Sequence, residues 1–224
     1  MRKVLIATPC YDGRVEGEYA LALAETVRLG QQAGVHFQPL LIKREPIARC
    51  RNNLLAIFYY APDYSDLLWI DADISWQPLH AIRLLQHQVD VVGGTYPRTE
   101  EPSTYVVKCD PEKLLVGANG LIEVEALGMG FLKMSRRAVN AVWEMGEPYQ
   151  RHGREQRWVF DEHIEDADVV SEDVVACARL RAAGLPIFLD PHITCQHTAA
   201  KTWVADFWTA LTEYHAKRKK PAAA

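Results

Sequence analysis

Two aspartates that directly follow an apolar run carry the strongest chemical signal in this sequence. Asp71 and Asp73, separated by one alanine, come after the run at 67–70. Carboxylates this close repel each other, and a divalent cation would hold both of them ionised at neutral pH. Their hard oxygen atoms suit magnesium or manganese. The pair therefore predicts a metal site, and two solvated turn aspartates are the alternative explanation.

The chain around this pair alternates between apolar runs, which predict strands, and stretches with helical spacing. The predicted strands of the first half lie at 3–7, 36–42, 66–70 and 89–92. The predicted helices between them lie at 17–33, 47–60 and 79–88. This alternation indicates right-handed crossovers and a mostly parallel sheet.

Polar groups concentrate in three loops that follow predicted strands. Ligands of an open parallel sheet bind beyond the carboxyl ends of its strands. We therefore expect residues 8–12, 71–73 and 93–96 to lie on one rim of the sheet.

The second half is less regular. Short strand-like pieces between 105 and 125 precede a strand at 131–134 and a helix for which Ser135 is the expected N-cap. A further helix is expected after its cap Ser171 and through residue 183, followed by a strand at 185–189 and an amphipathic helix at 203–217. Residues 146–170 show no clear period and predict a long loop. Loops this long are uncommon unless functional, so this one is either a lid or acceptor wall, or a solvated surface loop.

Length and composition limit the classes of protein that this chain can represent. The 224 residues suit a single domain, and a formal net charge of −4 argues against a broadly basic nucleic-acid binder. Five cysteines without a CxxC pair argue against a disulfide framework and favour reduced thiols in the cytoplasm. The first apolar run is too short for a signal peptide, and no run is long enough to cross a bilayer.

Six short segments, in this order, resemble the nucleotide-sugar-dependent glycosyltransferases of the GT-A fold. They are TPCYD at 8–12, ARCRNN at 48–53, DAD at 71–73, GMGF at 128–131, SED at 171–173, and the stretch 190–197. The resemblance covers about residue 3 to about residue 200. It implies an α/β chain of GT-A type, with a Rossmann-like, mostly parallel central sheet flanked by helices and a smaller mixed region on the acceptor side.

The resemblance also implies roles for individual residues. The implied metal ligands, for Mn²⁺ or Mg²⁺, are Asp71, Asp73 and His197. The implied nucleotide-binding residues are Pro9, Tyr11, Asp12, Arg51, Asn52 and Asp71. The implied catalytic residues are Asp173, as a general base in an inverting enzyme, and Glu172.

Each of these roles has a simpler alternative. His197 could be a satisfied core histidine, and carboxylates at a helix start are stabilised by the helix dipole whether or not they react. Arg49 and Arg51 lie two positions apart and point to different helix faces, so only one of them is expected to reach a phosphate.

The predicted activity is that of a metal-dependent glycosyltransferase of hexosyltransferase type, with a UDP-sugar as the expected donor. Hydroxymethylpyrimidine in phage-type DNA is one candidate acceptor, and a polysaccharide, a lipid or a protein is the alternative. A nucleotidyltransferase and an inactive sugar-nucleotide-binding module are the alternative classes. If the protein is phage-encoded, the expected location is the host cytoplasm.

Within the single domain 1–224, residues 1–97 are the expected nucleotide-binding half and 98–216 the acceptor-binding half, followed by a basic tail at 217–224. The sequence leaves open the sugar, the nucleotide base, the stereochemical course and the oligomeric state.

Overall fold

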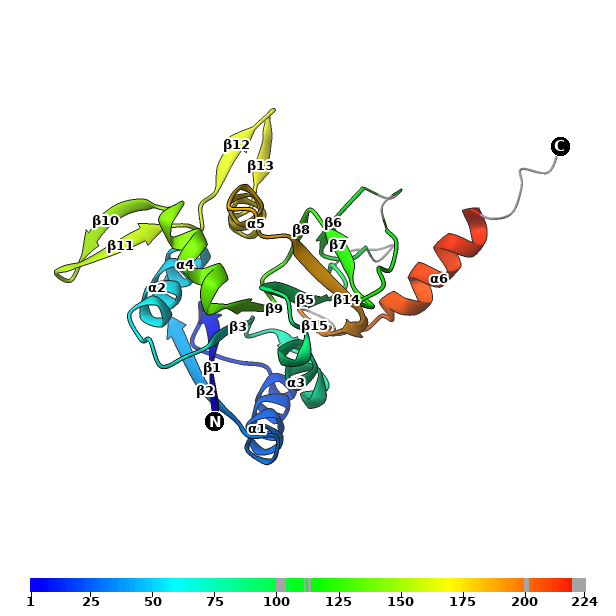
Figure 1. Cartoon of the computed structure of the whole chain (residues 1–224), viewed down its shortest axis with the longest axis horizontal. Helices are drawn as coiled ribbons and strands as arrows, with labels where there is room; N and C mark the ends of the chain where they lie inside the picture. The colour runs from blue at the N-terminus through cyan, green and yellow to red at the C-terminus, as the bar shows by residue number, and fades with distance from the viewer. Residues whose placement is uncertain (100–103, 111, 113, 200–201, 219–224) are drawn as a thin grey trace.

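The computed structural model describes residues 1–99, 104–110, 112, 114–199 and 202–218. Its main sheet consists of β1 (Arg2–Cys10), β2 (Val35–Lys43), β3 (Asp66–Ile70), β5 (Val91–Thr95), β7 (Ile122–Val124), β9 (Phe131–Ser135) and β14 (Ile187–Thr194). Figure 1 shows this sheet among the helices α1 (Gly17–Gln32), α2 (Ile47–Tyr59), α3 (Pro78–Gln86), α4 (Arg136–Glu144), α5 (Glu172–Ala182) and α6 (Phe207–Arg218).

The strands of the main sheet follow the order β2-β1-β3-β9-β5-β14-β7. β1 pairs in parallel with β2 and β3, and β14 pairs in parallel with β5. The strands β9 and β7 run antiparallel to their neighbours. The predicted α/β class with a mostly parallel central sheet flanked by helices is confirmed. The antiparallel insertion of β9 between β3 and β5 was not predicted.

Helices cover both faces of the sheet. One apolar core joins residues of α2, α4 and α5 to the sheet, and a second joins residues of α1 and α3 to its other face. Along β3, Leu67 and Trp69 belong to the first core, while Leu68 and Ile70 belong to the second. Because successive side chains of a strand point to opposite faces, a strand covered on both sides is apolar throughout.

Smaller sheets surround the main one. β4 (Ile74–Ser75), β15 (Gln196–Thr198) and β16 (Thr202–Trp203) form one of them, and β6 (Val107–Lys108) and β8 (Ala126–Leu127) form another. The main sheet takes strands from both halves of the chain, and the proposed boundary at residue 97 stays a prediction. Of the predicted tail, residues 217–218 end α6, and 219–224 lie outside the described residues.

The expectation of a long loop at 146–170 is wrong. This segment forms two hairpins, β10 (Glu147–Arg151) with β11 (Arg154–Trp158), and β12 (His163–Glu165) with β13 (Asp168–Val170). Their two-residue turns have positive φ at both central positions, with 50° and 75° in the first and 49° and 66° in the second. Such turns match the twist of paired strands. The polar strand residues hid this structure from a search for apolar periodicity.

The two expected serine caps differ. Ser135 caps α4 as predicted, because its hydroxyl accepts a hydrogen bond of 3.1 Å from the backbone N–H of Ala138. Ser171 stands at the N-cap position of α5, but its hydroxyl donates to the Asp173 carboxylate instead. Among the described residues, no helix has the length and apolar character needed to span a membrane.

Lys133 is a buried charge in the middle of the sheet. It lies on β9 with 1% of its surface exposed, and its Nζ donates to the backbone carbonyls of Val89 and His87. Burial lowers the pKa of Lys133 to about 8, and the nearby carboxylate of Asp66 only partly opposes this shift.

We predict a stability change that follows from this pKa. The folded chain binds the Lys133 proton less tightly than the unfolded chain, whose lysine has a pKa near 10.5. The free energy of unfolding therefore rises with pH between these two values. Between about pH 8 and about pH 10, the free energy of unfolding of the wild type should rise by about 2 kcal/mol relative to that of Lys133→Met. Urea titrations at several pH values measure this change. The prediction would be contradicted if the free energy of unfolding of the wild type, relative to that of Lys133→Met, stayed constant or decreased over this pH range.

Candidate functional site

A cleft of about 950 Å³ opens beyond the carboxyl ends of β1 and β3. These strands are parallel neighbours, so the segments that follow them meet at one edge of the sheet. Five of the predicted site residues line this cleft: Pro9, Tyr11, Asp12, Asp71 and Asp73. The start of α2 and residues 198–199 complete its wall.

The loop after β1 presents an aromatic ring and a carboxylate. The side chain of Tyr11 is exposed, and its backbone carbonyl accepts a hydrogen bond of 3.0 Å from the N–H of Arg44. Asp12 accepts a hydrogen bond of 2.9 Å from the N–H of Arg14 through Oδ1. The ring of Tyr11 is thus held at the cleft wall by its backbone and is free to stack on a flat group.

His197 and Asp73 come together although they lie far apart in the sequence. β15, which carries His197, pairs with β4, which begins directly after Asp73. The Nε2 atom of His197 lies 3.5 Å from Oδ2 of Asp73, and Nδ1 lies 3.0 Å from the carbonyl oxygen of Pro97. A carbonyl only accepts, so Nδ1 carries a proton and Nε2 faces the carboxylate. The hydrogen bond to Asp73 raises the pKa of His197.

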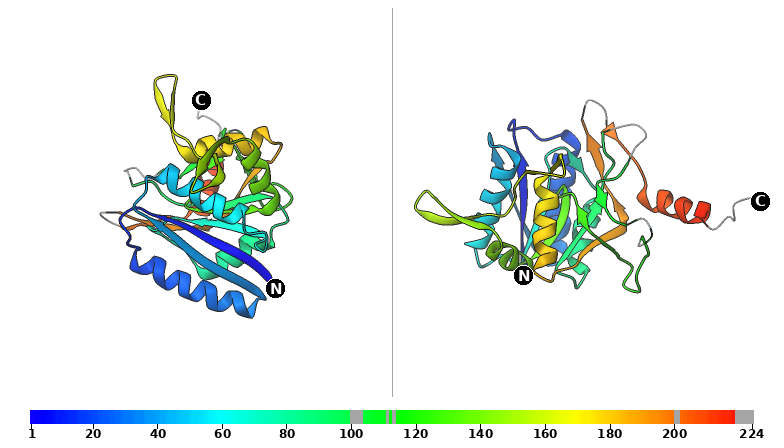
Figure 2. Two further views of the ribbon diagram at one scale, coloured as in Figure 1. Left: turned by 90° about the vertical axis from the view of Figure 1, so that its left-hand side faces the viewer. Right: turned by 90° about the horizontal axis from the view of Figure 1, so that it is seen from above.

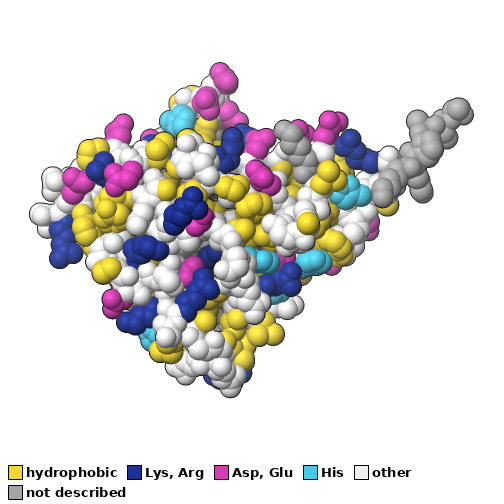
Figure 3. All heavy atoms as spheres, viewed as in Figure 1, with side chains coloured by type: hydrophobic (Ala, Val, Ile, Leu, Met, Phe, Trp, Pro, Cys, Tyr) yellow, Lys and Arg dark blue, Asp and Glu magenta, His cyan; other side chains and the backbone are white. Residues whose placement is uncertain are grey.

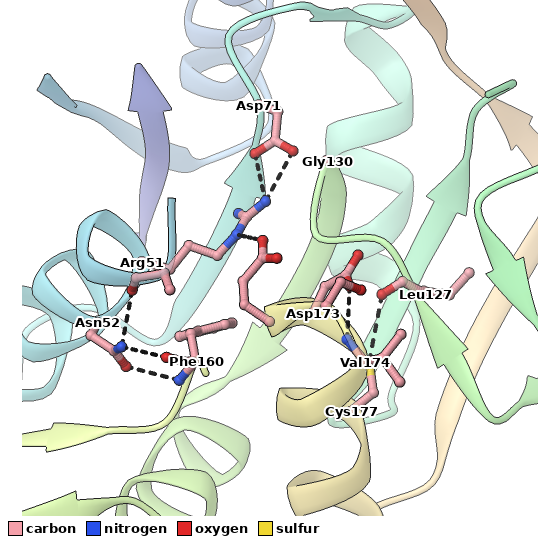
Figure 4. A network of polar contacts seen from close by, with 12 residues as sticks. Arg51, Asn52, Asp71, Leu127, Gly130, Phe160, Asp173, Val174 and Cys177 are labelled. Atoms are coloured by element: carbon pink, nitrogen blue, oxygen red, sulfur yellow. Dashed lines mark hydrogen bonds and ion pairs between the residues drawn. The ribbon is translucent and has the colours of Figure 1, made fainter. Parts of the chain in front are cut away.

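Asp71 belongs to a different cluster. The Nη2 atom of Arg51 lies 3.0 Å from both carboxylate oxygens of Asp71, and Nε lies 3.0 Å from Oε1 of Glu172 (Figure 4). Burial raises the pKa of Asp71, and the charge of Arg51 opposes that shift. Arg51 is not among the residues that line the cleft, and it reaches the cleft only through Asp71.

The predicted three-ligand metal site is not preformed. No group of three or more His, Cys, Asp or Glu side chains within the described part of the chain is arranged to hold a metal ion. Asp73 and His197 form a two-residue pair, while Asp71 is engaged by Arg51.

The structure gives Asn52 a structural role, and its part in nucleotide binding stays a prediction. Its Nδ2 donates to the carbonyls of Ala48 and Phe160, at 2.9 and 2.7 Å. Its Oδ1 accepts from the N–H groups of Val159 and Phe160, at 2.8 and 2.9 Å. These four bonds use the whole hydrogen-bonding capacity of the amide, so Asn52 ties α2 to the segment between the hairpins (Figure 4).

Asp173 lies at the start of α5, next to Glu172. Its Oδ1 accepts a hydrogen bond of 2.8 Å from the N–H of Val174, and a second one from the hydroxyl of Ser171. None of the hydrogen bonds found among the described residues involves its other oxygen, Oδ2. One carboxylate oxygen is therefore held in place, and the other can accept a proton.

Tyr96 is a site residue to which the sequence analysis assigned no role. It is buried, its hydroxyl accepts a hydrogen bond of 3.2 Å from the N–H of Gly130, and its ring meets the His197 ring edge-on at 5.4 Å. Burial raises the pKa of Tyr96, and the charges of Asp71 and Asp173 add to the effect. Tyr96 therefore lies near Asp71, Asp173 and His197, three residues that the sequence analysis assigned to the site.

The two glycines of the segment 128–131 make room for this tyrosine. A Cβ atom added at Gly130 would lie 2.7 Å from ring atoms of Tyr96, and one added at Gly128 would also collide with the tyrosine. The Gly-x-Gly spacing was visible in the sequence, but nothing in the sequence linked it to Tyr96.

We predict that Gly130→Ala destabilises the protein by about 1–3 kcal/mol, because the buried ring of Tyr96 has no space to withdraw. Urea denaturation measures the effect. Gly17→Ala is the matched control, since a Cβ at Gly17 meets nothing within 4 Å. Equal midpoints for the two variants would show that Tyr96 does not need the space left by Gly130.

Comparisons with known proteins bear on the fold alone. No protein-family model and no curated protein match this sequence. The crystal structure of A197 from STIV matches with a TM-score of 0.53 and 16% identity, over 89% of this chain and 86% of that one.

Two further solved structures match with TM-scores below 0.5. A glycosyltransferase involved in glycosylation of the major capsid of PBCV-1 has a TM-score of 0.34 and 15% identity, over 65% of this chain and 67% of that one. The inositol-1-phosphate CTP transferase from T. maritima has a TM-score of 0.41 and 12% identity, over 100% and 98%. The likeness to A197 therefore shows a shared fold, and the activity has to be argued from the residues of the cleft.

Proposed function

We propose that this chain is a metal-dependent glycosyltransferase that moves a sugar from a nucleotide sugar, with a UDP-sugar as the first candidate, to an acceptor hydroxyl. One observation carries the proposal. A single cleft at the carboxyl ends of parallel strands is lined by the exposed ring of Tyr11 and by the carboxylates of Asp12, Asp71 and Asp73. Asp73 also pairs with His197, which is not itself among the lining residues.

The nucleoside is expected beside the loop that follows β1. The exposed ring of Tyr11 offers a flat apolar surface to a base, and the carboxylates of Asp12 and Asp71 accept hydrogen bonds from ribose hydroxyls or from base N–H groups. The cleft volume of about 950 Å³ is large enough for a nucleotide sugar.

The chemistry of Asp73 and His197 fits a divalent cation. Carboxylate oxygen suits both Mg²⁺ and Mn²⁺, and an imidazole nitrogen favours Mn²⁺. The Pro97 carbonyl orients the imidazole, as groups behind metal-bound histidines do. Among the described residues Asp73 and His197 are the two candidate ligands, so the site would hold its cation together with the diphosphate oxygens of the donor. A cation bound there would offset the negative charge of the leaving diphosphate.

Asp173 is the candidate general base. The acceptor hydroxyl would lose its proton to Oδ2 while the oxygen bonds to the anomeric carbon and the bond from that carbon to the diphosphate breaks. Glu172 was predicted beside it as a second catalytic residue, but its carboxylate is nearly buried and bonds to Arg51. A base of this kind is needed only if the reaction inverts the anomeric centre.

The acceptor is the open part of the proposal. On the face shown in Figure 3, basic and acidic side chains are interspersed, which does not favour a broad nucleic-acid surface. A hydroxymethylpyrimidine in DNA, a glycan, a lipid or a protein each offers a suitable hydroxyl. Release of UDP only in the presence of an acceptor identifies a glycosyltransferase, whereas release of pyrophosphate would identify a nucleotidyltransferase.

We predict that turnover depends on a divalent cation. Excess chelator should abolish turnover, and manganese should restore it. Asp73→Asn and His197→Ala should each lower turnover by about 10²–10³-fold, since groups that stabilise developing charge contribute on that scale. Asp73→Asn should keep the thermal midpoint, because 49% of the Asp73 side chain is exposed. Asp63→Asn removes a surface carboxylate away from the cleft and serves as the control. Full activity in excess chelator would exclude this role of the cation.

We predict that Asp173→Asn lowers turnover by about 10²–10⁴-fold, the usual contribution of a general base. Donor affinity, measured by titration without acceptor, should change little because the group acts on the acceptor. Glu172→Gln keeps the oxygen that accepts from Arg51 and should have a smaller effect. An inverted product, identified by NMR, together with near-normal turnover in Asp173→Asn would refute the assignment.

A further inference from the structure

Arg51 is a charged side chain that the proposed reaction does not bring into contact with the donor. Only 3% of its side chain is exposed, and its guanidinium lies 5.6 Å from the centre of the Trp69 ring. It binds Asp71 through Nη2 and Glu172 through Nε, with all three nitrogen–oxygen distances at 3.0 Å (Figure 4).

The two carboxylates that Arg51 holds come from opposite halves of the chain. Asp71 directly follows β3 and lines the cleft, whereas Glu172 begins α5 and precedes Asp173. A guanidinium is a rigid planar fork, so groups bound at its Nε and Nη2 atoms keep a constant separation. The arginine therefore links the strand end beside the donor to the helix that carries the candidate base.

A direct contact between Arg51 and the donor diphosphate does not fit this geometry. Nη2 faces Asp71, which stands at the cleft wall, and a phosphate would have to displace that carboxylate. Nη1 is also buried and has no hydrogen-bond partner among the described residues. A buried N–H without a partner lowers stability, so packing alone does not account for an arginine at this position.

We infer that Arg51 is a positioning residue that fixes the separation between the donor-side carboxylate Asp71 and the base Asp173 by binding Asp71 and Glu172 together. The inference rests on the proposed function, because Asp173 has a reaction to perform only in that case. Arg51 acts through the two carboxylates and does not touch the phosphates.

The test compares four single variants and one double variant, Arg51→Lys with Glu172→Met, in the 224-residue chain, with a UDP-sugar and manganese as the probe. Arg51→Lys keeps a positive charge but cannot span both acids, and Glu172→Met removes the acceptor of Nε. Glu172→Gln keeps that acceptor, and Arg28→Lys changes an exposed arginine on α1, outside the cleft lining, as the matched control.

We predict that Arg51→Lys and Glu172→Met each lower kcat by about tenfold or more, while donor affinity without acceptor changes by less than about threefold. The double variant should have a kcat close to that of either single variant, because Arg51→Lys and Glu172→Met each break the same link between Arg51 and Glu172. Glu172→Gln should retain most of the turnover, and Arg28→Lys should match the wild type.

Other results would overturn the inference. Loss of UDP affinity in Arg51→Lys with unchanged kcat would indicate a direct phosphate contact. Additive effects on kcat in the double variant would show that Arg51 and Glu172 act independently. If Arg51→Lys does not fold, equal turnover in Glu172→Met and Glu172→Gln would count against the inference.

Failure of the proposed function can be distinguished from failure of the inference about Arg51. If the wild type binds no UDP-sugar, the proposed function fails. The link that Arg51 makes between Asp71 and Glu172 is then tested by the urea midpoints of the same variants. Additive shifts in these midpoints would show that Arg51 does not couple the two carboxylates.

Discussion

The parallel pairing of β1 with β3 is the constraint on which the rest of this structure depends. It places Ala7 beside Trp69 and brings the ends of both strands to one edge of the sheet. Because helices cover both faces, these strands are apolar and carry no chemistry themselves. The polar groups that β1 and β3 bring to the cleft lie beyond their carboxyl ends, in the segments that line it.

The acidic groups that gather at this edge need compensation, because like charges close together raise the free energy of the ionised state. The structure supplies it in two layers. In the interior, Arg51 binds Asp71 and Glu172, and at the cleft wall His197 faces Asp73. In the inner layer, one guanidinium holds both carboxylates. In the outer layer the described residues supply Asp73 and His197, and we propose that a cation and the donor diphosphate bind there.

Residues near strand ends could be located from the sequence. The loops containing Tyr11 and Asp71 follow apolar runs, and the rule for parallel sheets puts them on one rim. Asn52 could not be assigned in this way. It lies on a helix, and the face that is buried depends on the segment at 159–160, which lies more than one hundred positions further along the chain. Tyr96 was missed for a similar reason, since its partners Gly130 and His197 lie in segments far from it in the sequence.

The sequence by itself determined the alternation of strands and helices, the mostly parallel sheet and the position of its polar rim, because these follow from local periodicity and from strand-end rules. Only the tertiary structure decided that β9 enters the sheet antiparallel, that residues 146–170 form hairpins, and that Asp71 faces Arg51. The first and the last of these outcomes depend on contacts between distant segments, and the free energy of such contacts is not encoded in any local pattern. The hairpins pair neighbouring residues, but their polar strands gave no apolar periodicity from which to predict them.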